Sequence, residues 1–113
     1  MLTVLVVSGI KVSALQKAET NPYPYQRLVV TLLYDDIKTA INEYYDYQPR
    51  GYDLYNAEVT KLEPTRGWSN FNVTIEVESF YGPHNPPHAL EIMTFKIALA
   101  EEPELINYVH EDL

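Results

Sequence analysis

The sequence predicts an α+β fold in which one long N-terminal helix packs on an antiparallel sheet of three to four strands. Three observations predict it: a helical apolar period in the first half, alternating apolar and polar residues in the second half, and short connections between the alternating segments. Strands joined by short connections pair antiparallel, and a helix laid on one face of such a sheet buries both apolar stripes.

The helix is expected from about Tyr25 to Tyr45, after the breaker at residues 21–24 and before Pro49. One side of this segment is apolar at helical spacing, through Val29, Val30, Leu33, Ile37, Ala40, Ile41 and Tyr44. Leu28 and Leu32 lie on the other side, so the first half is apolar nearly all round. We expect a neighbouring segment to cover it.

Strands are expected wherever apolar and polar residues alternate. The first places Tyr55, Ala57 and Val59 on one face, and a turn at residues 64–67 ends it. The clearest strand covers residues 71–77, with Glu76 and Glu78 on its solvated face. The next has Glu91, Met93, Phe95, Ile97 and Leu99 on one face, and residues 105–110 form a possible fourth strand.

Composition limits the function classes. The chain has 113 residues, 46% of them hydrophobic, which suits a single domain, here residues 25–113. Its formal net charge is −8, and its basic residues are scattered, so we expect no nucleic-acid partner. There is no cysteine, which excludes a disulfide framework, a cysteine-ligated zinc and a cysteine nucleophile. No cofactor is indicated.

The N-terminus predicts export. Residues 1–10 are apolar, and Val12-Ser13-Ala14 offers a small-x-small cleavage site, so residues 1–14 are interpreted as a signal peptide. Residues 15–24 then form an N-terminal arm. No basic residue precedes the apolar run, and the alternative is a first β-strand from Thr3 to Ile10. The run is too short to span a bilayer, so we expect no transmembrane span in the mature chain and an extracellular or cell-envelope location.

The loop Gly82-Pro83-His84-Asn85-Pro86-Pro87-His88 is the main candidate binding site. Its prolines and glycine fix much of the backbone, so it would lose little entropy on binding a partner. His84 and His88 are four residues apart, but the prolines forbid the helix on which that spacing would indicate a metal, and no metal site is predicted. The alternative is that His84 and Asn85 are turn residues that hold the hairpin in register.

Aromatic residues extend the candidate surface. Five tyrosines gather around the end of the helix, at positions 44, 45, 47, 52 and 55, and such a cluster can form a peptide or glycan platform or cap the core. Tyr47 and Tyr52 are taken as binding candidates with His84, Asn85 and His88. Trp68, next to a turn, is a further candidate, as an exposed anchor or a core lid.

The sequence favours a non-catalytic module that binds a protein, a peptide or a cell-envelope component, and no catalytic residue is assigned. The alternative is a metal-binding or hydrolytic enzyme that uses His84 with Glu78, Glu91 or His110. His110, Glu111 and Asp112 are otherwise interpreted as a hydrophilic chain end. A third possibility is a protease inhibitor that inserts the loop into its target.

Several of these motifs together resemble a family of small exported proteins from spore-forming Gram-positive bacteria, a domain of unknown function. The resemblance runs from about Tyr25 to Leu113 and is carried by Tyr52-x-Leu54-Tyr55-x-Ala57, Phe71-x-Val73-Thr74-x-Glu76-Val77, Gly82-Pro83-His84-Asn85-Pro86-Pro87, Thr94-Phe95 and His110-Glu111. It implies export and no particular activity, and His88 stands where the family is expected to have an aromatic residue. The helix followed by an antiparallel meander is also similar to the cystatin layout, which hosts inhibitors, dimerising modules and enzymes.

Overall fold

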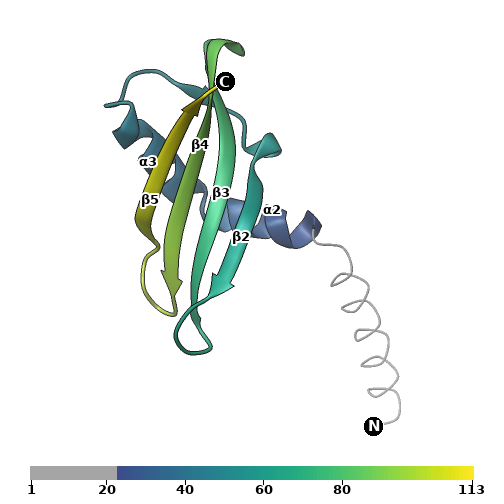
Figure 1. Ribbon diagram of the computed structural model, residues 1–113, viewed down its shortest axis with the longest axis vertical. Helices are drawn as coiled ribbons and strands as arrows, with labels where there is room; N and C mark the ends of the chain where they lie inside the picture. The colour runs from purple at the N-terminus through teal and green to yellow at the C-terminus, as the bar shows by residue number, and fades with distance from the viewer. Residues whose placement is uncertain (1–22) are drawn as a thin grey trace.

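A computed structural model of the protein describes residues 23–113. The expected signal peptide, residues 1–14, lies outside the described residues, as does the expected arm up to residue 22. Two helices cover one face of an antiparallel sheet, with α3 behind β4 and β5 and α2 behind β2 and β3 in Figure 1. The elements are α2 (Tyr23–Leu32), α3 (Tyr34–Tyr44), β1 (Gly51–Tyr52), the 3-10 helix η1 (Leu54–Asn56), β2 (Glu58–Pro64), β3 (Asn70–Tyr81), β4 (Asn85–Ala98) and β5 (Glu104–Asp112).

The sheet confirms the predicted α+β class and its antiparallel pairing. β3 pairs with β4 on one side, and β4 pairs with β5. On its other side β3 pairs with β1 near its end and with β2 along its first half. The expected count of three to four strands is wrong, because the two-residue strand β1 adds a fifth. The possible fourth strand at residues 105–110 is present as β5.

The prediction of one long helix is wrong, because the helix breaks at Leu33. The backbone there has φ −97° and ψ 11°, away from helical values. The residues before the break disfavour a straight helix: β-branched side chains are crowded there, and the Thr31 hydroxyl donates to the Arg27 carbonyl oxygen at 2.7 Å. The break leaves Leu33 itself buried against the sheet.

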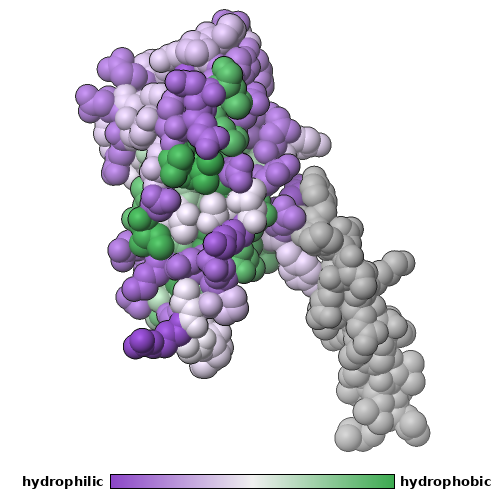
Figure 2. Space-filling view, in the orientation of Figure 1, coloured by the Kyte–Doolittle hydropathy of each residue, from purple (hydrophilic) through white to green (hydrophobic). Residues whose placement is uncertain are grey.

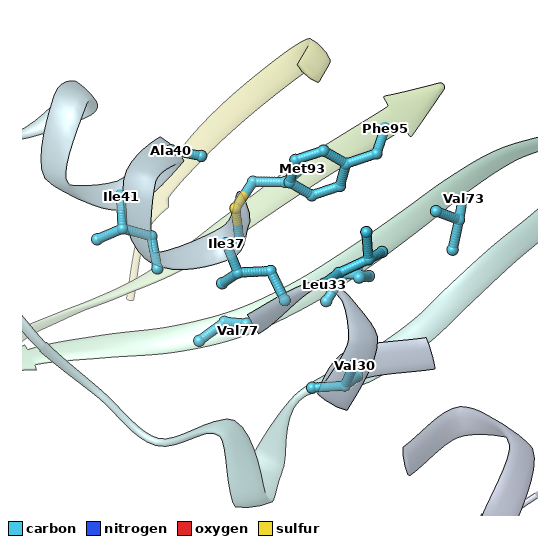
Figure 3. Packing of buried hydrophobic residues seen from close by; sticks show 10 residues of the cluster. Val30, Leu33, Ile37, Ala40, Ile41, Val73, Val77, Met93 and Phe95 are labelled. Carbon is cyan, nitrogen blue, oxygen red and sulfur yellow. The ribbon is translucent and has the colours of Figure 1, made fainter. Parts of the chain in front are cut away.

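The core lies between the helices and the inner face of β3 and β4 (Figure 3). Ile37 and Ile41 from α3 are fully buried, and they face residues that alternate along the strands as the sequence predicted. The strand residues of this core are Val73, Ile75, Val77, Met93 and Phe95. We expected a neighbouring segment to cover the other side of α2. Within residues 23–113 no segment does so, since Leu28 is 53% and Leu32 is 71% exposed.

Within residues 23–113 no helix covers the opposite face of the sheet. Figure 2 shows this face with hydrophilic and hydrophobic residues interspersed. Glu76 pairs directly with Glu58 of β2 across the ladder, and both lie on this open face because the adjacent pair, Ile75 with Val59, points inward.

Three boundaries differ from the predictions: the start and the end of β2 and the start of β4. Tyr55 was expected on the core face of a strand, but it lies in η1 and is 85% exposed, because Asp53 accepts a hydrogen bond from its backbone N–H and starts a 3-10 turn. The strand β2 therefore begins later and runs on to Pro64, the first residue of the expected turn. The expected seven-residue loop at 82–88 is a three-residue turn at 82–84, since β4 already begins at Asn85.

Candidate functional site

A buried carboxylate is the most unusual feature of the core. Glu91 lies on the inner face of β4 between Ala89 and Met93, and its exposed fraction is 0%. A buried charge is costly unless it is fully hydrogen-bonded. Its surroundings therefore have to supply donors to both carboxylate oxygens.

Four side chains supply these donors, and with Glu91 they form what we call the polar network. Tyr45 and Ser79 donate their hydroxyls to Oε2. The Tyr108 hydroxyl donates to Oε1 at 3.0 Å, and His110 Nδ1 lies 3.0 Å from the same oxygen. Because a carboxylate can only accept, the proton of that bond is on Nδ1. The network thus joins the end of α3 to β3, β4 and β5.

The hydrogen bonds decide the charge state of the polar network. Burial alone would raise the pKa of the Glu91 carboxyl, but its four hydrogen bonds outweigh this and hold the pKa below its usual range. The bond to Glu91 raises the pKa of His110. Burial, with the bond to the carboxylate, raises the pKa of Tyr45 to about 12. Burial and the Glu91 charge raise the pKa of Tyr108 as well.

Aromatic rings and a guanidinium cover the polar network. The ring of Tyr44 stacks on Tyr108, with centroids 4.6 Å apart and an interplanar angle of 9°, and on His110 at 5.2 Å. Arg50 donates from Nε to Ser79 Oγ at 3.0 Å and lies over the Tyr45 ring, 5.0 Å from its centroid. On the outer side, His110 Nε2 lies 2.8 Å from Asp112 Oδ1.

This arrangement suits a structural role better than acid-base chemistry. Both oxygens of Glu91 already accept two hydrogen bonds each, and the carboxylate does not reach solvent. Within residues 23–113 no group of three histidine or acidic side chains could hold a metal. Of the groups in the alternative enzyme prediction, the structure joins Glu91 to His110. Glu78 instead pairs with His88 Nδ1 at 3.1 Å.

His84 is placed at the β3–β4 hairpin, where it packs on the domain. Its ring stacks on Phe80, with centroids 4.1 Å apart and an interplanar angle of 25°. Phe80 is buried, and it also contacts Gly51, where an added Cβ would come within 2.5 Å of the ring. His84 has φ 62° and Gly82 has φ 50°, so both adopt the left-handed conformation that a tight turn requires. His84 thus lies in a turn and packs on the domain, and its role in holding the hairpin in register stays a prediction.

The other predicted binding residues are spread over the molecule. Asn85 is exposed at the start of β4, Tyr47 is 69% exposed after α3, and Tyr52 packs partly buried against the core. Trp68 is 84% exposed, so it is not a core lid. It lies in the β2–β3 turn, at the opposite end of β3 from the hairpin, and does not join the surface around His84 (Figure 1).

A large groove lies between α2 and the outer edge of the sheet. Its volume is about 830 Å³, and it follows η1 and the first residues of β2. Exposed aromatic residues stand at its sides, since Tyr55 is 85% and Tyr34 is 44% exposed. The groove, here called the α2–β2 groove, is lined by Gln26, Arg27, Val30, Thr31, Tyr34, Leu54, Tyr55, Asn56, Ala57, Glu58, Val59 and Thr60.

A second, smaller cavity lies near the break between the helices. Its volume is about 300 Å³, and its lining is apolar, with residues such as Leu33, Leu62 and Phe71.

Among the described residues no helix is long and apolar enough to cross a membrane.

The sequence-based site prediction missed the α2–β2 groove and most of the polar network. One signal for the network was present: Glu91 shares its strand face with Met93 and Phe95, so the same alternation that buries them also buries the carboxylate. Another was the two-residue spacing of Tyr108 and His110, which places both on one face of β5.

Comparison with known proteins identifies a family. A family model described as "Protein of unknown function (DUF3888)" matches residues 25–112. No curated protein matches the chain, and no solved structure does.

Proposed function

This chain belongs to the DUF3888 family of proteins of unknown function, and we propose that it is an exported, non-catalytic module that binds a protein, peptide or cell-envelope component in the α2–β2 groove. The observation that carries the proposal is the groove itself. Its volume of about 830 Å³ lies within the usual range for ligand sites, and its lining mixes aromatic, aliphatic and polar side chains.

The rigidity of the groove walls also supports binding. One wall is α2, whose Val30 is buried in the core, and the other is β2, which is paired with β3 over most of its length. A preformed groove loses little conformational entropy when it is occupied. The exposed ring of Tyr55 is a contact of the kind that dominates binding energy at interfaces.

A non-catalytic role agrees with the state of the acidic and histidine groups. The Glu91 carboxylate has no oxygen left for a substrate, and the His110 ring is held between Glu91 and Asp112. Neither group lines the α2–β2 groove. An enzyme would need such groups at a cavity, within reach of a reacting atom.

Selection from a displayed library of random heptapeptides tests the proposal, with affinities then measured by isothermal titration calorimetry. We expect the selected peptides to bind the wild type and to lose at least about tenfold in affinity to a Tyr55→Ala Asn56→Ala variant. Both side chains are exposed, so the variant should fold normally.

The matched control is a His84→Ala Asn85→Ala variant, because the hairpin is the alternative binding surface. Equal binding of every selected peptide to the Tyr55→Ala Asn56→Ala variant, with loss in the hairpin variant, would refute the groove and favour the hairpin. Selection that yields no binding peptide at all would count against a peptide-binding module.

Export is the second part of the proposal, and it rests on the apolar run of residues 1–10 and the site at Val12-Ser13-Ala14. The full chain, expressed in a Gram-positive host, should be recovered from the medium with the mass of a chain that begins near Leu15. An uncleaved chain retained in the cytoplasm would contradict export.

A further inference from the structure

The strand β2 forms an unpaired edge of the sheet along the α2–β2 groove. Among residues 23–113 it pairs with β3 on one side and with no strand on the other. In an antiparallel strand, every second residue directs its N–H and C=O away from the partner strand, so β2 presents a row of backbone donors and acceptors on its outer side. Such a row is a template for another strand.

The groove lies along the half of β2 that holds neither lysine nor proline. Charged and proline residues commonly block sheet edges, and here Lys61 and Pro64 stand in the second half of β2. The lining of the groove takes in the first residues of β2, Glu58, Val59 and Thr60, together with Ala57 just before them. A register shift between Val59 and Lys61 marks Thr60 as the extra residue of a bulge, and that exposed residue has no partner in β3.

The charges beside this edge indicate which side chain the added strand would carry. Glu58 lies directly opposite Glu76 on the open face, and like charges in that position repel. Among residues 23–113 neither glutamate has an ion-pair partner. A residue of the added strand opposite Glu58 would place its side chain on the same face, where a lysine or arginine would neutralise the pair.

We propose that the occupant of the α2–β2 groove is an extended peptide segment that adds as a strand to β2 at residues 57–60 and places a lysine or arginine beside Glu58. This inference rests on the proposed function and specifies the ligand of the same site. The net charge of −8 also favours approach of a cationic segment.

Three synthetic probes test the inference by titration into ¹⁵N-labelled protein. The first is an acetylated, amidated hexapeptide of alternating threonine and valine with lysine at one central position. The second carries glutamate at that position. The third is the lysine peptide with N-methyl groups on alternate backbone nitrogens, which removes hydrogen bonds while it keeps the side chains.

We expect saturable shifts of the amide signals of residues 57–60 with the lysine peptide, and binding of the glutamate peptide weaker by about three- to tenfold. N-methylation on the bonded side should weaken binding by about tenfold or more. Glu58→Lys should reverse the preference between the two charged peptides. Glu104→Lys is the matched control, because it makes the same charge change on the other edge strand and should leave the preference intact.

The failures of the two proposals can be told apart. If the N-methylated peptide binds as tightly as its parent at residues 57–60 whichever set of alternate nitrogens is methylated, strand addition is refuted and groove binding stands. If all probes shift signals at the hairpin instead, or if no probe binds, the strand-addition inference is overturned. Library-selected peptides that remain sensitive to Tyr55→Ala Asn56→Ala would then still support the groove.

Discussion

Replacing Glu91 by glutamine should destabilise the domain strongly, although the two side chains have nearly the same volume. The carboxylate accepts hydrogen bonds from four donors, two at each oxygen. An amide accepts at one oxygen and presents an NH₂ group in place of the other. Two of the four donors therefore lose their acceptor, and they have to reorganise around the NH₂ group of the glutamine.

The size of the effect follows from these losses. A buried donor left without a partner costs about 1–3 kcal/mol, and Ser79 is fully buried while the other donors are partly exposed. The expected loss is about 2–4 kcal/mol, which is a large part of the stability of a small domain. For a domain of this size it corresponds to a fall in the melting temperature of roughly 10–20 °C.

Urea unfolding followed by far-UV circular dichroism measures this loss, with Glu78→Gln as the matched control. Glu78 is half exposed and pairs with His88 at 3.1 Å, so the control should lose under about 1 kcal/mol. The reasoning is refuted if Glu91→Gln unfolds within about 0.5 kcal/mol of the control, because the network would then contribute nothing that a neutral amide cannot replace.

Three further predictions concern the same fold. Stability from the His110–Glu91 pair should be greatest between about pH 4.5 and 6.5. Because the pKa of His110 is raised in the folded state, its contribution is full below about pH 6.5 and is lost as the pH rises through the folded-state pKa of His110. Because the pKa of Glu91 is lowered in the folded state, its contribution is full above about pH 4.5 and is lost as the pH falls through the folded-state pKa of Glu91. Urea midpoints across pH 3–9 measure this, and a profile unchanged by His110→Gln would contradict it. Gly51→Ala should lower the free energy of unfolding by about 1–3 kcal/mol, because the new Cβ would lie 2.5 Å from Phe80 Cε1 and the buried ring would have to move. In a Phe80→Leu background most of this loss should disappear. An equal loss in both backgrounds would exclude the clash. Tyr45→Phe, which keeps the ring and removes one donor to the carboxylate, should cost about 1–2 kcal/mol by the same unfolding assay, and an unchanged midpoint would show that this bond is dispensable.

The fold class and the strands could be predicted because alternation is a local property. Residues 71–77 alternate in sequence, and residues 72–77 alternate between half-buried and buried in the structure. The helix break was not predictable from periodicity, because Leu33 fits the apolar stripe on both sides of it. Its cause includes a hydrogen bond from the Thr31 hydroxyl to the backbone, which competes with straight helix geometry.

The candidate sites were harder to predict because they depend on contacts far apart in the sequence. Tyr45 and Glu91 are 46 residues apart in the sequence, and no local sequence pattern predicts that they are in contact. The α2–β2 groove is similar, since its two walls face each other only through the topology of the sheet. In contrast, a turn role for His84 could be foreseen as an alternative, since turn chemistry is local, but its stacking on Phe80 was not predicted.

The central claim, that the α2–β2 groove binds the ligand, is tested most directly by photo-crosslinking. Benzoylphenylalanine is placed at position 55 in the groove in one variant and at position 84 on the hairpin in another, and each is irradiated with a library-selected peptide. If the ligand binds in the groove, we expect a crosslink from position 55 that excess unlabelled peptide suppresses, and no crosslink from position 84. A competed crosslink from position 84 alone would contradict the claim.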